Sequence, residues 1–372
     1  MSQKKNSRLW SRLRVLCCAG LDLMSITPDA FAIVHELIPN AASALFLTSH
    51  DGVPQGFYHE DSPDEAQNLF LNEPQLFIGP DEYNVLRLVG TPGAVKIGQL
   101  LQPPQEFFKS NTYQLLVRAS GHHHTLDARL EVDGRRAGLI TLYREAGIRF
   151  SLQDADDLAR VAIHFEHALR IGTASPHQPA DIVEHEAIIV AHTDGKPLFI
   201  SQAANALLAA IPLVGPQWPD RRKLPLFCER LIEILQDGER HPWTMPSHTI
   251  PLPGGALHVS AQWLCAAGAE SPVGAVAASE SGLVGISLKQ STPTPLRVWR
   301  NLNKAALSPQ QMEVAFWMAL GGGRDAARAR MPISEAVLRD CVKSVYETLG
   351  CASQEEMINV LLAAPQTSVS IQ

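Results

Sequence analysis

The chain has 372 residues, of which 45% are hydrophobic and 19% are charged, and its formal net charge at pH 7 is −7. These values indicate a soluble globular protein of two to three domains, at about one domain per 150 residues. They exclude a polycation that binds nucleic acid with its whole surface, so such affinity must come from a local patch. No run of about 18 or more uncharged apolar residues is present, so no membrane span is expected.

The cysteines and the N-terminal stretch indicate a reduced, cytoplasmic protein. No pair of the six cysteines has Cys-x-x-Cys spacing, and no Cys/His cluster offers four ligands at zinc spacing. We therefore expect free thiols, no metal and no cofactor. A short apolar run follows the basic residues near the N-terminus, but Asp22 interrupts it, so no secretory signal is expected.

Two proline-rich stretches suggest boundaries. Residues 173–181 are polar and contain two prolines, and residues 291–296 contain two more. Such stretches suit linkers better than packed elements. They divide the chain into segments 1–172, 182–290 and 297–372.

The first segment contains a predicted β-hairpin. Apolar and polar residues alternate over 126–132, as in a half-buried strand. Asp133-Gly134 is a strong turn sequence because glycine accepts a positive φ without steric cost. A second strand is expected directly after the turn.

A helix is predicted after Ser151, which can cap it. Its apolar face consists of Leu158, Ala162, Phe165 and Leu169. A hairpin closed by an amphipathic helix resembles the end of a GAF domain. The resemblance implies an α/β sensor domain over residues 1–172.

The second segment begins at 186–211 with a strand, an Asp-Gly turn, a second strand and an alanine-rich helix. This order resembles the opening of a PAS domain, where a strand pair leads into short helices over a ligand-sized cavity. The resemblance implies a small-molecule sensor over 182–290 with a largely apolar cavity. The candidate lining residues are Phe199, Trp263 and Cys265. Plain core packing is the alternative for Phe199 and Trp263.

The run His122-His123-His124 raises the question of a metal site. Consecutive strand residues point to opposite faces, so at most two of these side chains share a face. No acidic or cysteine partner lies at a useful spacing, so no metal is expected here.

The third segment predicts four short helices with tight breaks. Ser308 can cap the first helix, with Pro309 at its first position and Gln311 closing a capping box. Ser334 and Gly350 suit the start and the end of the third helix. The arrangement contains a helix-turn-helix.

Residues 307–357 resemble the DNA-binding domain of LuxR/NarL-type transcriptional regulators. The family pattern is matched without a gap at Leu307-Ser308-Pro309, Glu313-Val314, Ala319, Gly321, Ile333-Ser334, Val345-Tyr346, Leu349-Gly350 and Ser353. The resemblance implies that 297–372 binds double-stranded DNA as a homodimer, with RNA polymerase as a further candidate partner.

The helix that begins near residue 335 is then the recognition helix. The residues opposite its apolar stripe are Ala336, Arg339, Asp340, Lys343, Ser344 and Glu347. The resemblance assigns the main base and phosphate contacts to Arg339, Asp340 and Lys343. Arginine can bond guanine bidentately, aspartate can accept from cytosine, and lysine can bind phosphate or guanine. Without the family pattern, a solvated helix face is the alternative interpretation.

The second helix departs from the family pattern. Where the family has a large aliphatic residue followed by alanine, this chain has Ala327 and Arg328, so the core is thinner and an arginine must reach solvent. Residues 304–356 also hold six Lys/Arg and seven Asp/Glu, which predicts weak phosphate attraction. The alternative function is therefore a sensor with a degenerate helix-turn-helix that acts through protein contacts.

The expected fold class is multidomain α+β, with GAF-like and PAS-like α/β sensor domains followed by an all-α four-helix helix-turn-helix domain. The expected function is a cytoplasmic transcriptional regulator that responds to an unknown small-molecule effector. No GxSxG motif, P-loop or GxGxxG followed by an acid is present, so an enzyme is not expected.

Overall fold

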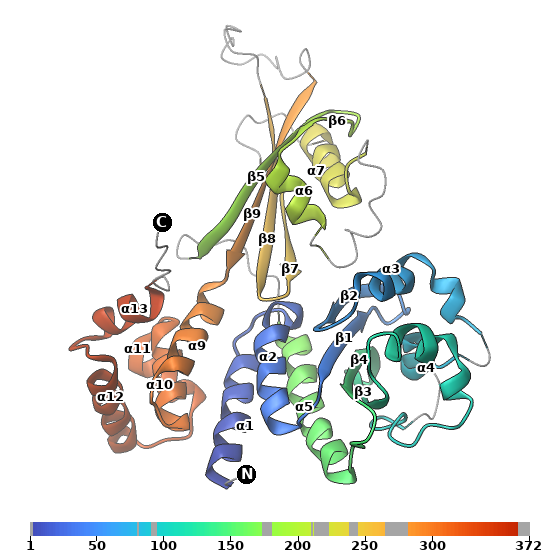
Figure 1. Ribbon diagram of the computed structural model, residues 1–372. Helices are drawn as coiled ribbons and strands as arrows, with labels where there is room; N and C mark the ends of the chain where they lie inside the picture. The colour runs from blue at the N-terminus through green and yellow to red at the C-terminus, as the bar shows by residue number, and fades with distance from the viewer. Residues whose placement is uncertain are drawn as a thin grey trace, which may run out of the picture.

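The computed structural model describes residues 3–79, 82–90, 95–172, 181–209, 211, 223–237, 245–264 and 282–363. These ranges contain two antiparallel sheets, helices that pack on them, and a group of helices at the C-terminal end (Figure 1). The described fold is therefore mixed α and β, and its strands form two separate antiparallel sheets. None of the described helices has the length and apolar character that crossing a membrane requires.

The first sheet has the strand order β2-β1-β4-β3. Its strands are β1 (Ala42–Thr48), β2 (Pro54–His59), β3 (His124–Val132) and β4 (Arg135–Arg144). The predicted hairpin is confirmed: β3 pairs with β4, and Asp133 and Gly134 between them have φ values of 51° and 73°. Both angles lie in the left-handed region that a two-residue hairpin turn requires.

One face of the first sheet packs against helices α1 (Gln3–Cys17), α2 (Leu23–Leu37) and α5 (Leu152–Ile171), which lie side by side in Figure 1. Alternate strand residues such as Leu45, Leu126 and Ile140 point into this core. The predicted apolar face of α5 is confirmed at Leu158, Ala162 and Phe165, which are fully buried or nearly so.

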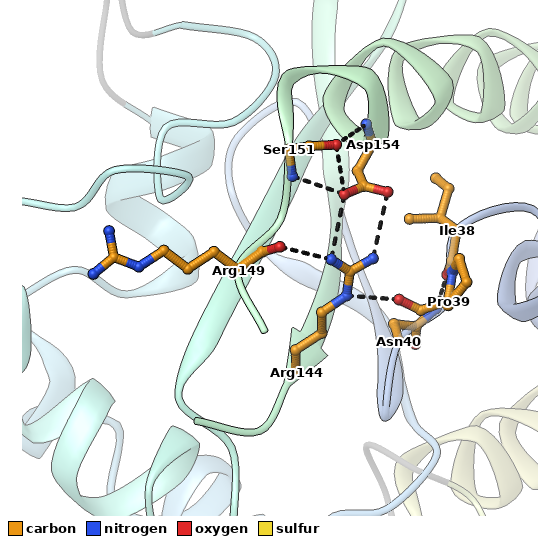
Figure 2. Close-up of polar contacts among 7 residues, drawn as sticks. All are labelled: Ile38, Pro39, Asn40, Arg144, Arg149, Ser151 and Asp154. Carbon is orange, nitrogen blue, oxygen red and sulfur yellow. Dashed lines mark hydrogen bonds and ion pairs between the residues drawn. The ribbon is translucent and has the colours of Figure 1, made fainter. Parts of the chain in front are cut away.

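Arg144, at the end of β4, fixes the connection to α5 (Figure 2). Its guanidinium donates to the carbonyls of Pro39 and Arg149 at 2.7 and 2.9 Å and contacts Asp154 at 3.3 Å. Ser151 and Asp154 form the capping box of α5. Burial acts to raise the pKa of Asp154, but hydrogen bonds from Ser151 and Arg144 outweigh it and lower that pKa.

The opposite face of the first sheet is covered by short elements between β2 and β3. They are α3 (Asp64–Asn72), η1 (Pro74–Phe77), α4 (Val85–Gly90), η2 (Phe107–Lys109) and the π-helix η3 (Thr112–Val117). Apolar side chains of these elements and of β4 form a second, smaller cluster that includes Leu88, Phe107 and Leu139. The first sheet is thus buried on both faces.

The second sheet has the order β6-β5-β9-β8-β7. Its strands are β5 (Ile182–His192), β6 (Pro197–Ile200), β7 (Ser247–Leu252), β8 (Gly255–Trp263) and β9 (Leu283–Thr292). Helices α6 (Gln202–Ala209) and α7 (Leu226–Asp237) pack on one face of this sheet. Their apolar residues and those of the sheet form a core separate from the first.

The C-terminal helices are α9 (Thr294–Lys304), α10 (Pro309–Ala319), α11 (Gly323–Arg330), α12 (Glu335–Leu349) and α13 (Gln354–Leu362). The predicted caps are confirmed: Ser308 and Gln311 form a capping box on α10, and Ser334 caps α12. Gly350 ends α12 in the left-handed conformation, with φ of 65°.

The predicted linker at 291–296 is wrong. Strand β9 continues to Thr292 and α9 begins at Thr294, so the stretch joins two regular elements directly. Pro295 sits in the first turn of α9, where proline is tolerated because that backbone N–H would be unpaired anyway. Residues 173–180 of the other predicted linker lie outside the described residues.

Helix α1 joins the first sheet to the C-terminal helices. Arg14 donates from Nη1 to Oε1 of Glu313 on α10 at 2.8 Å, and its other terminal nitrogen contacts Oε2. The indole of Trp299 on α9 donates to the carbonyl of Arg12 at 3.3 Å. Apolar residues of α1, α9 and α10 belong to one continuous core with the first sheet.

The turn between β7 and β8 joins the second sheet to the other two parts. The Gly254 N–H donates to the carbonyl of Ser25 on α2 at 3.0 Å, and the Ser25 hydroxyl donates to the carbonyl of Gly255 at 2.7 Å. Arg300 on α9 pairs with Asp29 of α2 at 2.7 Å and donates to the Gly254 carbonyl at 3.2 Å. One arginine therefore contacts both sheet-containing parts.

Candidate functional site

A cavity of about 80 Å³ lies on the face of the first sheet that is turned away from α1, α2 and α5. All four strands contribute to its floor, and α3, α4 and the segment from Leu100 to His122 contribute to its cover. None of the described residues that line it is Asp, Glu, Lys or Arg. The side chains used in the argument below are Phe46, Phe57, His59, His122, Thr125 and Tyr143.

His122 and Thr125 are buried polar residues of this cavity that lack hydrogen-bond partners within the described ranges. They are only 6% and 4% exposed. Within the described residues, neither ring nitrogen of His122 nor the Thr125 hydroxyl has a hydrogen-bond partner. A buried polar group without a partner costs about 1–3 kcal/mol, and native proteins normally satisfy such groups with protein, water or ligand. These atoms are the strongest indication that the cavity is a binding site.

Three nearly parallel rings stand at one side of the cavity. The ring centroid of Tyr143 is 5.2 Å from that of His122 and 5.3 Å from that of His59, and the two imidazoles are 6.3 Å apart. Burial, followed by the effect of His122, lowers the pKa of His59 to about 4. Burial also lowers the pKa of His122, although Asp61 and Glu145 act to raise it. Both imidazoles are therefore neutral at pH 7.

The three consecutive histidines lie in different surroundings. His122 lines the cavity, whereas Nδ1 of His123 is 2.6 Å from the Tyr113 hydroxyl, and His124 begins β3. Among the described residues, no group of three or more His, Cys, Asp or Glu side chains is placed to hold a metal ion.

The residues predicted to line a cavity in the second segment are not brought together. Phe199 is 72% exposed on the outer face of edge strand β6, so it lies outside the apolar interior. Trp263 is partly buried against the second core, which is the plain packing alternative. Cys265 lies outside the described residues.

His59, Thr125 and Tyr143 were not predicted as site residues, and His122 was considered only as a metal ligand. One signal was available, since Thr125 alternates with the apolar residues predicted to face the core and therefore had to face the opposite side. Nothing in the pattern showed that this opposite side would be covered by a second layer.

Helix α12 is buried on one side and exposed on the other. Leu338, Val342 and Val345 are buried. The predicted contact residues Ala336, Arg339, Asp340, Lys343 and Glu347 are exposed, and Ser344 is partly buried. Three of them, Ser344, Lys343 and Glu347, already have local partners. Gln311 donates to the Ser344 hydroxyl at 2.8 Å, and Lys343 lies 4.0 Å from Glu347.

The two residues of α11 that depart from the family pattern, Ala327 and Arg328, do not place a charge in the core. Ala327 is fully buried. The Arg328 side chain is 66% exposed, and its guanidinium lies 3.6 Å from the carboxylate of Glu335 at the start of α12. The arginine therefore reaches solvent, as expected, and makes an exposed ion pair of the kind that contributes little stability.

No protein-family model matches the chain, and no curated protein sequence matches it. Solved structures with weak similarity include the E. coli DhaR(N)-DhaL complex, which is 12% identical, with 78% of this chain and 90% of that chain covered and a TM-score of 0.20. Another is the sensor region of a sensor histidine kinase, which is 11% identical, with 73% of this chain and 97% of that chain covered and a TM-score of 0.18. With TM-scores this low, neither similarity carries an argument about fold or function.

Proposed function

We propose that the chain is a cytoplasmic, ligand-responsive regulator of transcription that binds double-stranded DNA as a homodimer through α12. The observation that carries the proposal is the two-sided character of α12: its apolar side is buried, and the side bearing Arg339, Asp340 and Lys343 is exposed. A helix with caps at both ends and a free polar side is what insertion into a major groove requires.

The cavity of the first sheet is the effector site in this proposal. Its unpaired His122 and Thr125 side chains and uncharged lining fit a small-molecule pocket with a few converging polar groups. The two sheet-containing parts act as GAF-like and PAS-like sensors. The second opens with the strand pair β5 and β6 followed by the short helix α6, in agreement with that interpretation.

Helix α9 connects sensing to DNA binding in this scheme. Arg300 contacts Asp29 beside the first sheet and Gly254 of the second sheet, and Asn301 on the same helix donates to the carbonyl of Leu361 on α13 at 2.8 Å. A shift in either sensor can therefore change how α9 holds the C-terminal helices. Such a shift affects DNA affinity only if the effector binds the two arrangements with different affinity.

The proposal is tested by fluorescence anisotropy of the full chain with fragments of its own upstream DNA at low salt. We expect Arg339→Ala to weaken specific binding by about 1–3 kcal/mol per half-site, because a bidentate base contact is lost. Lys343→Ala should weaken binding to all sequences and reduce the salt slope by about one per subunit. Arg170→Ala, at an exposed arginine on α5, changes the net charge equally and should leave binding unchanged. Wild-type affinity of Arg339→Ala, or no binding of any fragment, would refute the proposal.

A second candidate function, a sensor that acts through protein contacts, is favoured by the local partners of three predicted DNA contacts. Ser344 is bonded to Gln311, and Lys343 lies beside Glu347, which reduces the free polar groups of α12. This candidate would be supported if the wild-type chain bound no DNA fragment and captured a protein partner in a way that requires Arg339 or Asp340.

A further inference from the structure

We infer that the cavity of the first sheet takes a small uncharged molecule with both a hydrogen-bond donor and an acceptor, held by His122 and Thr125. This inference rests on the proposed role of the cavity as the effector site, and it adds the chemical class of the effector. Three observations carry it: the polar atoms without partners among the described residues, the uncharged described lining, and the small volume.

The unpaired atoms define what the ligand must offer. A neutral imidazole has one N–H donor and one acceptor nitrogen, and a threonine hydroxyl can both donate and accept. Both nitrogens of His122 and the hydroxyl of Thr125 lack partners among the described residues. A molecule with a donor and an acceptor close together satisfies several of these atoms, whereas a molecule with acceptors alone leaves the acceptor nitrogen unpaired.

The described lining residues offer no charged partner to a ligand at neutral pH. None of the described lining residues has an acidic or permanently basic side chain. Burial keeps the imidazoles of His59 and His122 neutral. Among the described lining residues, an anion entering the cavity would meet no cation to replace its lost hydration, and a cation would meet no carboxylate. The remaining wall is apolar and aromatic, with Phe46 and Phe57 among its members.

The volume limits the size of the ligand. The cavity measures about 80 Å³, whereas an engineered cavity of about 150 Å³ is known to bind benzene. Scaled from the six carbon atoms of benzene, this volume fits a ligand of about three to four non-hydrogen atoms. Short-chain amides and small hydroxylated compounds meet both the size and the hydrogen-bonding requirements.

Four planar probes of matched size separate the possibilities: acetamide, acetone, acetate and acetamidinium. Acetamide is neutral and has a donor and an acceptor, acetone has only an acceptor, and the other two carry opposite charges. Each is titrated into the full chain labelled with ¹⁵N-histidine at pH 7.5, and the His122 ring nitrogens are followed by NMR. We expect acetamide to shift both nitrogens saturably, acetone to bind at least about tenfold more weakly, and the two ions to have no effect.

Two variants assign the response to the proposed atoms. Thr125→Val is nearly isosteric and should weaken acetamide binding by about tenfold or more, because it removes only the unpaired hydroxyl. His122→Phe should abolish binding, which is followed in this variant at the ring nitrogens of His59, because His59 also lines the cavity. His123→Phe is the matched control, since the neighbouring imidazole is paired with Tyr113 and should leave acetamide affinity unchanged.

Equal or tighter binding of acetate or acetamidinium would overturn the inference, and so would the absence of any shift at His122 with all four probes. Retained acetamide affinity in Thr125→Val would also overturn it. The titration requires no DNA. A failure of the proposed function would therefore appear in the anisotropy experiment, and a failure of this inference would appear only at His122.

Discussion

At the scale of single residues, the cavity side of the first sheet holds groups whose placement opposes stability. His122 and Thr125 are buried and lack hydrogen-bond partners among the described residues. Asp127, on the same face of β3 as Thr125, is a buried carboxyl group. Burial raises the pKa of Asp127 to about 6, although the backbone N–H of Leu100 donates to it at 2.6 Å. Functional sites commonly retain such groups at a cost in stability.

The Asp127 carboxyl group predicts a measurable pH dependence. Because its folded pKa lies above the ordinary value of 3.8, its contribution to stability is fully present below that value and is lost as the pH rises through about 6. Asp127→Asn removes this loss. We expect the variant to gain about 2 kcal/mol relative to wild type between pH 4.5 and pH 7.5.

Urea unfolding of both proteins at these two pH values measures this difference. The comparison is needed because His59 acts in the opposite direction: its lowered pKa makes wild-type stability rise with pH between about 4 and the ordinary histidine value of 6.5. His59 is present in both proteins and cancels. Parallel pH profiles for wild type and Asp127→Asn would show that Asp127 is ionised without penalty.

At the scale of elements, one side chain of α9, that of Arg300, contacts both sheet-containing parts. The Arg300 guanidinium reaches both oxygens of Asp29 and also the carbonyl of Gly254. Gly254 has φ of 82°, and a Cβ there would lie 3.3 Å from the Arg300 guanidinium. The β7–β8 turn can therefore approach α9 this closely because it has a glycine at its tip.

Arg300→Lys should loosen this junction while keeping the charge. A lysine ammonium is a compact donor and cannot reproduce the planar, two-sided contact. We expect faster hydrogen exchange at the Gly254 amide and in the first turn of α2, with unchanged exchange in the centre of β8. Lys304→Ala, on the same helix but bonded to Asn301, is the control and should have no such effect. Unchanged exchange at the Gly254 amide in Arg300→Lys would show that Arg300 does not hold the turn.

At the scale of the whole molecule, the described residues form two large cores rather than three. The C-terminal helices share one continuous apolar core with α1, α2, α5 and the first sheet, whereas the second sheet has its own. Elements that share a core tend to unfold together. The C-terminal helices are therefore expected to unfold with the first sheet, even though the second sheet lies between them in the chain.

The Arg14–Glu313 pair tests this shared unit. Glu313 is nearly buried, so Arg14→Ala leaves a carboxylate without its cation and should cost about 1–3 kcal/mol. The loss should be smaller than for a fully buried pair because Arg14 is half exposed. In a Glu313→Gln background the same change should cost much less, since a neutral amide does not require the cation.

Thermal unfolding measured by calorimetry on the four proteins of this double-mutant cycle gives the coupling. We expect Arg14→Ala to lower the midpoint of the transition that includes the first sheet and the C-terminal helices, and to leave the transition of the second sheet in place. An Arg14→Ala effect of the same size in both backgrounds would mean that the pair contributes no coupling between α1 and α10.

Features that depend on near neighbours in the chain can be predicted from the amino-acid pattern. Ser308 and Ser334 start their helices, Asp133-Gly134 turns the hairpin, and the apolar spacing of residues 335–349 predicts which side of α12 is buried. Each depends on side chains within a few positions of one another, where local propensities and periodicity are informative.

Only the tertiary structure decided where the cavity lies and how the parts are joined. Arg14 and Glu313 are 299 residues apart, and Arg300 and Asp29 are 271 apart, so no local pattern could pair them. The exposed position of Phe199, predicted as a ligand residue of the second segment, has the same kind of cause. Whether an aromatic side chain such as Phe199 faces a cavity or solvent depends on what packs over its strand, and that layer comes from elsewhere in the chain.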